Sequence, residues 1–161
     1  MKIIGIDPGQ SGALAVLFHG KITALLDMPV SARLHGKGLQ VDGYSIATWM
    51  LEQTAGDDVQ VLIEAVSAMP GQGTASMFRF GESVGVVLGV CGALQLPVRW
   101  VRPAQWKRKA GLIGKPKDAA RTLAIQLHPE IAGQLTRKKD VGRADAICIA
   151  HFSRQFCKIR E

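Results

Sequence analysis

The sequence predicts a single α/β domain, built on a mixed five-stranded sheet with helices on both faces. Three short apolar segments joined by tight turns open the chain, which favours three antiparallel strands. Two further β-branched segments alternate with helical patterns, which favours parallel strands beside the first. With 161 residues, 47% of them hydrophobic, the chain suits one domain with its own core, residues 1–161.

The expected antiparallel strands cover residues 2–7, 12–18 and 21–28, with His19-Gly20 as the turn between the second and third. Residues 29–41 are polar and contain His35-Gly36-Lys37-Gly38, so we expect a loop there. Asp42 is expected to cap a helix that ends near residue 53.

The second half of the sheet is expected to come from strands at residues 59–65 and 97–101, with a helix at about 74–94 between them. Gly81, Gly85 and Gly89 lie four apart on one face of that helix, and each costs about 1 kcal/mol relative to alanine. Such a stripe indicates close approach of another backbone, from the sheet or from a second subunit. Further helices are expected from residue 102, over 115–128 and over 143–156, with a basic loop at 133–142.

Three acids lie at the ends of apolar elements. Asp7 ends the first strand, Glu64 closes the fourth, and Asp145 lies in the first turns of the last helix. Burying a carboxylate costs several kcal/mol unless it is paired or binds a metal. Asp7 alone could simply cap the turn that follows it. Three such acids together suggest a site for a hard cation such as Mg²⁺, at the carboxyl ends of the strands.

The charge is divided unevenly along the chain. Residues 1–98 carry five lysines and arginines against eight acids, whereas residues 99–161 carry fifteen against five. A basic half beside a carboxylate-bearing half suits a protein that binds a polyphosphate backbone and acts on it. A basic face that serves only solubility is the alternative interpretation.

The three cysteines show no C-x-x-C spacing and no zinc pattern, and no signal peptide is evident. We therefore expect reduced thiols and a cytoplasmic location. The most apolar stretch, residues 84–96, is too short to span a membrane, so no membrane partner is expected.

The motifs resemble those of the RuvC-type Holliday junction resolvases, in order and spacing over nearly the whole chain. The matching segments are Ile-Gly-Ile-Asp-Pro-Gly at 4–9, Ile63-Glu64, Gly85-Val86, Leu96-Pro97-Val98, Pro103-x-Gln105-Trp106-Lys107 with residues 111–117, and Arg143-Ala144-Asp145-Ala146.

This resemblance implies a ribonuclease H-like fold and a homodimer that cuts four-way DNA junctions symmetrically, in a bacterial or phage-infected cell. It implies Mg²⁺ or Mn²⁺ as cofactor, two ions per site, held by Asp7, Glu64 and Asp145. Lys107 and Lys117 match family positions that face DNA. The residues expected to contact DNA are Trp106, Lys107, Lys115, Lys117, Arg137, Lys138, Lys139 and Arg143.

The chain departs from the family pattern at two positions. Family members usually carry an acid or a histidine three residues before the last acid, where this chain has Gly142. Asp140 is the nearest substitute and is a candidate fourth catalytic acid. Relatives often place an aromatic residue where this chain has Ser67, and the nearby alternatives are Met69, Phe78 and Phe80.

Two other classes of function remain open. The Asp7 turn also resembles the first phosphate loop of actin-like and sugar-kinase ATPases, although this chain is expected to be too short for the second domain that closes over ATP. The missing acid at Gly142 is also compatible with a module that binds branched nucleic acid without cutting it.

Overall fold

The structure is a computed structural model that describes residues 1–65, 71 and 73–154. Its main sheet has five strands in the order β3-β2-β1-β6-β7. Strands β1 (Lys2–Asp7), β2 (Ala13–Phe18) and β3 (Lys21–Asp27) are antiparallel neighbours. Strands β6 (Val59–Glu64) and β7 (Val98–Val101) continue the sheet parallel to β1. The predicted mixed sheet is confirmed.

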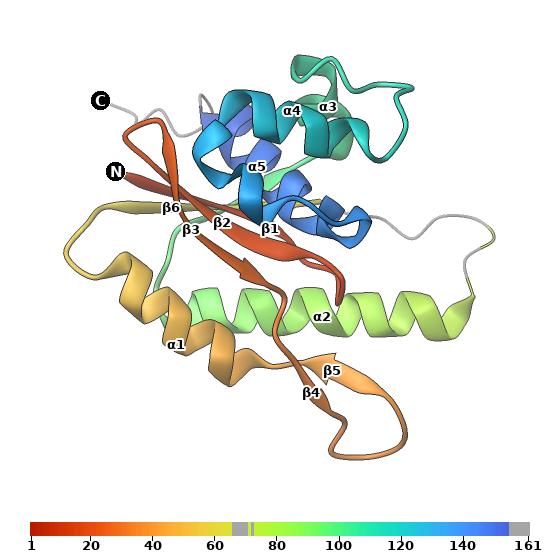
Figure 1. Ribbon diagram of the computed structural model, residues 1–161. Coiled ribbons are helices and arrows are strands. Elements are labelled where there is room, and N and C mark those ends of the chain that lie inside the picture. The colour runs from red at the N-terminus through yellow and green to blue at the C-terminus, as the bar shows by residue number, and fades with distance from the viewer. Residues whose placement is uncertain (66–70, 72, 155–161) are drawn as a thin grey trace.

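Helices cover both faces of this sheet, as Figure 1 shows. On one face lie α1 (Gly43–Thr54) and α2 (Thr74–Ala93), and on the other lie α3 (Pro103–Lys109), α4 (Ala119–Leu127) and α5 (Val141–Ser153). Side chains alternate between the faces along each strand, which gives two separate buried clusters. Ile4 and Ile6 pack toward α1 and α2, whereas Ile3 packs toward α5.

A glycine in β1 brings α5 unusually close to the sheet. A Cβ atom at Gly5 would lie 2.3 Å from the carbonyl oxygen of Ala146 and 2.6 Å from the backbone nitrogen of Ala150. Any side chain there would push α5 away from β1. Since Asp7 follows two residues later and Asp145 lies on α5, this close packing fixes the distance between two of the candidate acids.

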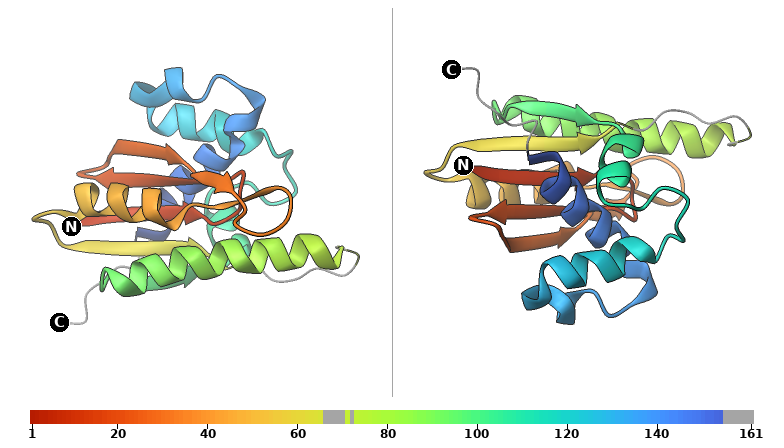
Figure 2. Two further views of the ribbon diagram at one scale, coloured as in Figure 1. Left: turned by 90° about the horizontal axis from the view of Figure 1, so that it is seen from below. Right: turned by 90° about the horizontal axis from the view of Figure 1, so that it is seen from above.

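The expected loop at residues 29–41 is instead a β-hairpin, so that prediction is wrong. Strands β4 (Val30–Ala32) and β5 (Leu39–Val41) pair with each other and form a separate two-stranded sheet. The hairpin projects beside the first half of α2, and that half of α2 extends past the ends of the strands (Figures 1 and 2). Each strand is only three residues long, Val30-Ser31-Ala32 and Leu39-Gln40-Val41, which is too short for its apolar–polar alternation to indicate a strand.

Helix boundaries differ from the prediction in the second half of the chain. Helix α4 begins at Ala119, because Gly114 has a left-handed backbone and Pro116 disfavours helical geometry in the residue before it. The 3₁₀ helices η1 (Pro129–Gln134) and η2 (Lys138–Asp140) occupy half of the expected basic loop at residues 133–142. Helix α5 therefore starts at Val141, and its predicted end at 156 lies outside the described residues.

The glycine stripe of α2 does not pack on the sheet. Gly81, Gly85 and Gly89 are exposed, and a Cβ atom at any of them would meet nothing within 4 Å. Of the two explanations for the stripe, packing against the chain's own sheet is therefore wrong for the residues described. Within the described segments no helix combines the length and the hydropathy that a membrane crossing requires.

Candidate active site

The three acids predicted from the sequence lie together at the carboxyl ends of the parallel strands. Asp7 and Glu64 each follow directly after Ile6 and Ile63, which are paired in register between the parallel strands β1 and β6. Asp145 comes from α5, which packs across β1. All three side chains are half-buried. The parallel pairing of β1 with β6 and the close approach of α5 thus place three carboxylates from distant parts of the chain together.

These carboxylates repel one another. Burial, together with the charge of Glu64, raises the pKa of Asp7 to about 6. Burial, followed by the charges of Asp7 and Glu64, raises the pKa of Asp145 to about 7. The Lys107 ammonium and, for Asp7, a 3.4 Å hydrogen bond from the Gly9 backbone N–H lower these pKa values only in part. The site therefore has an excess of negative charge that the chain itself does not neutralise.

Trp106 holds one of the acids in place. Its indole N–H donates a 2.9 Å hydrogen bond to Oε1 of Glu64, and the indole ring is fully buried. The Nζ of the next residue, Lys107, lies 5.2 Å from the centre of the Trp106 ring, within cation–π range. A single buried side chain thus orients a carboxylate and the cation beside it. Trp106 also lines the cavity beside the acids although its side chain has no exposed surface, and its expected contact with DNA stays a prediction.

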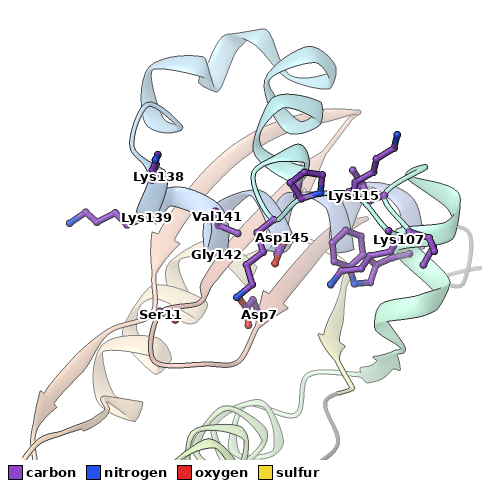
Figure 3. Close-up of a pocket in the computed structure, with 16 residues that line it drawn as sticks. Asp7, Ser11, Lys107, Lys115, Lys138, Lys139, Val141, Gly142 and Asp145 are labelled. Carbon is purple, nitrogen blue, oxygen red and sulfur yellow. The ribbon is translucent and has the colours of Figure 1, made fainter. Parts of the chain in front are cut away.

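Asp7 and Asp145 line a cavity of about 550 Å³ (Figure 3). Asp7 and Asp145 lie at its centre and lysines surround it, with Lys138 and Lys139 on the side of η2 and Lys107 and Lys115 on the opposite side. Lys117 completes the lining, and its charge lowers the pKa of Asp145. We call this cavity the lysine pocket. Six of the residues predicted to contact DNA therefore line the pocket: Trp106, Lys107, Lys115, Lys117, Lys138 and Lys139.

Close packing explains why position 142 is a glycine. A Cβ atom at Gly142 would lie 2.3 Å from the carbonyl oxygen of Ser11 and 2.9 Å from Cα of Gly12. The turn after Asp7 therefore occupies the space that a side chain at position 142 would need. The same turn brings Ser11 into the lining of the lysine pocket.

Asp140 does not join the other acids, so the structure gives no support to its role as a fourth catalytic carboxylate. Its side chain is buried and accepts hydrogen bonds from the Arg137 guanidinium at 2.6 and 2.9 Å and from the Arg137 backbone N–H at 2.7 Å. Arg137 accordingly lowers the pKa of Asp140. Asp140 lines a different cavity, together with Asp27.

Two arginines expected to contact DNA are engaged within the protein. Arg143 donates to Asp27 at 2.7 Å and to the Gln134 carbonyl at 2.9 Å, which ties α5 to β3. Arg137 is half-exposed, but its guanidinium binds Asp140. Both arginines therefore keep only part of their donor capacity for DNA, and their expected contacts with it stay predictions.

Of the positions considered for an aromatic contact with DNA, the structure describes only Phe78 and Phe80. Ser67 and Met69 lie outside the described residues. Phe78 is 71% exposed on α2, so its ring is available to a partner. Phe80 is half-buried near the turn that follows Asp7, since a Cβ atom at Gly9 would lie 3.7 Å from its ring.

The donor set suits a hard divalent cation. Asp7 and Asp145, whose pKa values are raised, gain more from such an ion than an isolated surface acid does, and carboxylate oxygens are the ligands that Mg²⁺ and Mn²⁺ prefer. Within residues 1–65, 71 and 73–154, no three acids, histidines or cysteines already lie at the spacing of a closed metal cage. The three acids are therefore grouped, and a bound ion would have to draw them closer together.

Comparisons with solved structures establish the fold. The chain superposes on Thermus thermophilus RuvC with a TM-score of 0.60 and 21% identity, covering 97% of this chain and 96% of the other. It also superposes on "T. thermophilus RuvC in complex with Holliday junction substrate" with a TM-score of 0.58 and 17% identity, covering 98% and 97%. The chain has the ribonuclease H-like fold of RuvC, as predicted.

One curated relative is similar in sequence. It is the chloroplastic Holliday junction resolvase MOC1 of Chlamydomonas reinhardtii, 34% identical over 96 residues. The match covers 59% of this chain but only 11% of the relative, so this chain corresponds to about a tenth of that protein's length. No protein-family model matches the chain.

The raised pKa values predict that the metal-free protein loses stability as the pH rises. Below about pH 4 the carboxyl groups of Asp7 and Asp145 are protonated in both the folded and the unfolded chain. Above it the unfolded chain releases these protons first, since the folded protein retains them up to about pH 6 and 7. Stability should therefore fall between about pH 4 and 7 and remain low above that range.

Asp145→Asn should remove much of this loss and, at pH 8 in chelator, raise the free energy of unfolding by about 2 kcal/mol or more. Urea unfolding at pH 5 and pH 8 measures the effect, with Asp58→Asn at an exposed acid as the matched control. Equal stability changes in the two variants would show that the acids do not repel one another.

Trp106→Phe should weaken Mn²⁺ binding by about tenfold, because it removes the donor that orients Glu64 and keeps an aromatic ring. Trp49→Phe, on the other sheet face, is the matched control and should leave Mn²⁺ affinity unchanged. Calorimetric titration measures both variants. Equal Mn²⁺ affinities in the two variants would show that Trp106 does not position Glu64 for metal binding.

Proposed function

We propose that this chain is a structure-selective DNA endonuclease that hydrolyses phosphodiester bonds in four-way (Holliday) junctions. One observation carries the proposal: three mutually repelling carboxylates lie together, and two of them, Asp7 and Asp145, line a pocket ringed by lysines. Carboxylates of this kind hold divalent cations, and lysines bind phosphates. The fold of RuvC and the sequence similarity to a Holliday junction resolvase support the choice of substrate.

Asp7, Glu64 and Asp145 would hold Mg²⁺ or Mn²⁺, two ions per site. When bound, the ions supply an activated water and stabilise the leaving oxygen of the scissile phosphate. Asp7 lies at the end of the central strand. It interacts electrostatically with both Glu64 and Asp145, so it is the acid best suited to bind both ions. Trp106 keeps one oxygen of Glu64 engaged, which would leave the other oxygen to bind an ion.

The lysines would bind and orient the DNA strand. Lys107 is close enough to Asp7 and Asp145 to lower their pKa values, and its ammonium contacts the Trp106 ring. It is therefore well placed to contact a phosphate next to the reacting one. Lys115, Lys117, Lys138 and Lys139 extend the positive charge along both sides of the pocket. This arrangement would guide a strand across the acids.

A homodimer would supply the two cuts that resolving a junction requires. One site cuts one strand, and a two-fold axis places a second site at a fixed separation. The glycine stripe of α2 supports an interface there, because Gly81, Gly85 and Gly89 leave an open surface where a second backbone can approach. Phe78 and half-buried Val86 and Val90 flank this surface.

The proposal predicts metal-dependent paired nicks. Wild-type protein incubated with a labelled four-way junction in Mg²⁺ should cut two opposing strands at symmetric positions. Asp7→Asn should lower the rate about a thousandfold while keeping junction binding, because it removes a metal ligand worth several kcal/mol of transition-state stabilisation. Asp140→Asn, at a buried acid outside the lysine pocket, is the control for a general effect of losing a carboxylate near α5.

Undiminished cutting by Asp7→Asn would contradict the assignment of the metal site. A wild-type protein that binds junctions in Mg²⁺ and never cuts them would instead make the chain a branched-DNA binding module.

A further inference from the structure

A second basic groove lies on the opposite face of the sheet from the lysine pocket. It runs between the β4–β5 hairpin and the first turns of α2 and encloses about 510 Å³. We call it the hairpin groove. Its lining combines four side chains that are or can be positively charged with one exposed aromatic ring, from the residues Arg33, His35, Lys37, Arg79 and Phe78.

Two contacts fix the hairpin groove relative to the active site. The Arg33 guanidinium pairs with Glu82, which locks the hairpin onto α2. The side-chain amide of Gln10 donates a 2.9 Å hydrogen bond to the carbonyl oxygen of Leu39, which ties the hairpin to the turn that follows Asp7. The groove is therefore held next to the catalytic edge by direct contacts.

Most of the basic side chains in the hairpin groove are not paired with an acid among the described residues. Glu82 pairs with Arg33, whereas the side chains of His35, Lys37 and Arg79 form no ion pair with any residue in the part of the chain that the structure describes. Leu34 is 85% exposed on the hairpin loop and Phe78 is 71% exposed on α2. Free cations combined with exposed apolar side chains suit a nucleic-acid backbone, with its phosphates and apolar sugar edges.

We propose that the hairpin groove binds the phosphate backbone of a DNA arm that leaves the catalytic edge on the face of α1 and α2. The inference rests on the proposed function and extends it. The lysine pocket holds DNA on the face of α3, α4 and α5, and the hairpin groove holds it on the other face. A branched substrate can place phosphates on both faces of the sheet edge at once, which gives it an advantage over a straight duplex.

The test compares two charge-matched double variants. Lys37→Ala with Arg79→Ala removes two free cations from the hairpin groove. Lys21→Ala with Arg99→Ala removes two exposed cations at the opposite edge of the sheet, where the parallel strands begin. Fluorescence anisotropy measures binding to a labelled four-way junction in EDTA, which prevents cutting, over a range of salt concentrations. Equal melting temperatures establish that both variants are folded.

The groove variant should bind about tenfold more weakly at 150 mM salt, and its slope of log affinity against log salt should fall in magnitude by roughly 2. The control variant should keep the wild-type slope. Equal slopes and affinities in both variants, with a wild type that cuts junctions in Mg²⁺, would overturn this inference alone. A wild type that binds no junction at all would overturn the proposed function and this inference together.

Discussion

Repulsion among Asp7, Glu64 and Asp145 is the constraint on which the rest of the site depends. The three carboxylates are half-buried at one sheet edge, where burial and mutual charge raise the pKa of Asp7 to about 6 and that of Asp145 to about 7. A fold does not maintain such an arrangement for its own stability. The surrounding structure acts to hold it: Gly5 lets α5 approach β1, and the parallel pairing of β1 and β6 brings Asp7 and Glu64 together.

The positively charged side chains around these acids fall into two groups. Lys107 and its neighbours in the lysine pocket face the acids, whereas Arg137 and Arg143 are engaged with Asp140 and Asp27 and stabilise the entry to α5. The hairpin groove adds a second positive surface on the other side of the same edge. Positive charge on both sides of a negative centre is the arrangement that a phosphate backbone requires in order to approach acidic ligands.

The sheet and the three acids could be predicted because their signal is local. Apolar segments that end on an acid reveal both a strand and a functional side chain at its end. The β4–β5 hairpin could not be predicted in this way, since its strands are only three residues long and neither ends on an acid. Trp106 lies in a basic segment that suggests a surface position, and only the tertiary fold buries it against Glu64. The pairing of Arg143 with Asp27 joins residues 116 apart in sequence, and no local pattern encodes it.

The most direct test of this account is the number of protons released when Mg²⁺ binds to the wild-type protein. An ion that occupies the site must displace the protons that the raised pKa values retain. Calorimetry at pH 6.5 in two buffers of different ionisation enthalpy should detect release of about one proton per site, declining toward zero at pH 8.5 and falling to about a quarter in Asp145→Asn, where only Asp7 still retains a proton. Mg²⁺ binding without proton release at pH 6.5, or with release unchanged in Asp145→Asn, would contradict the claim that these three acids form the metal site.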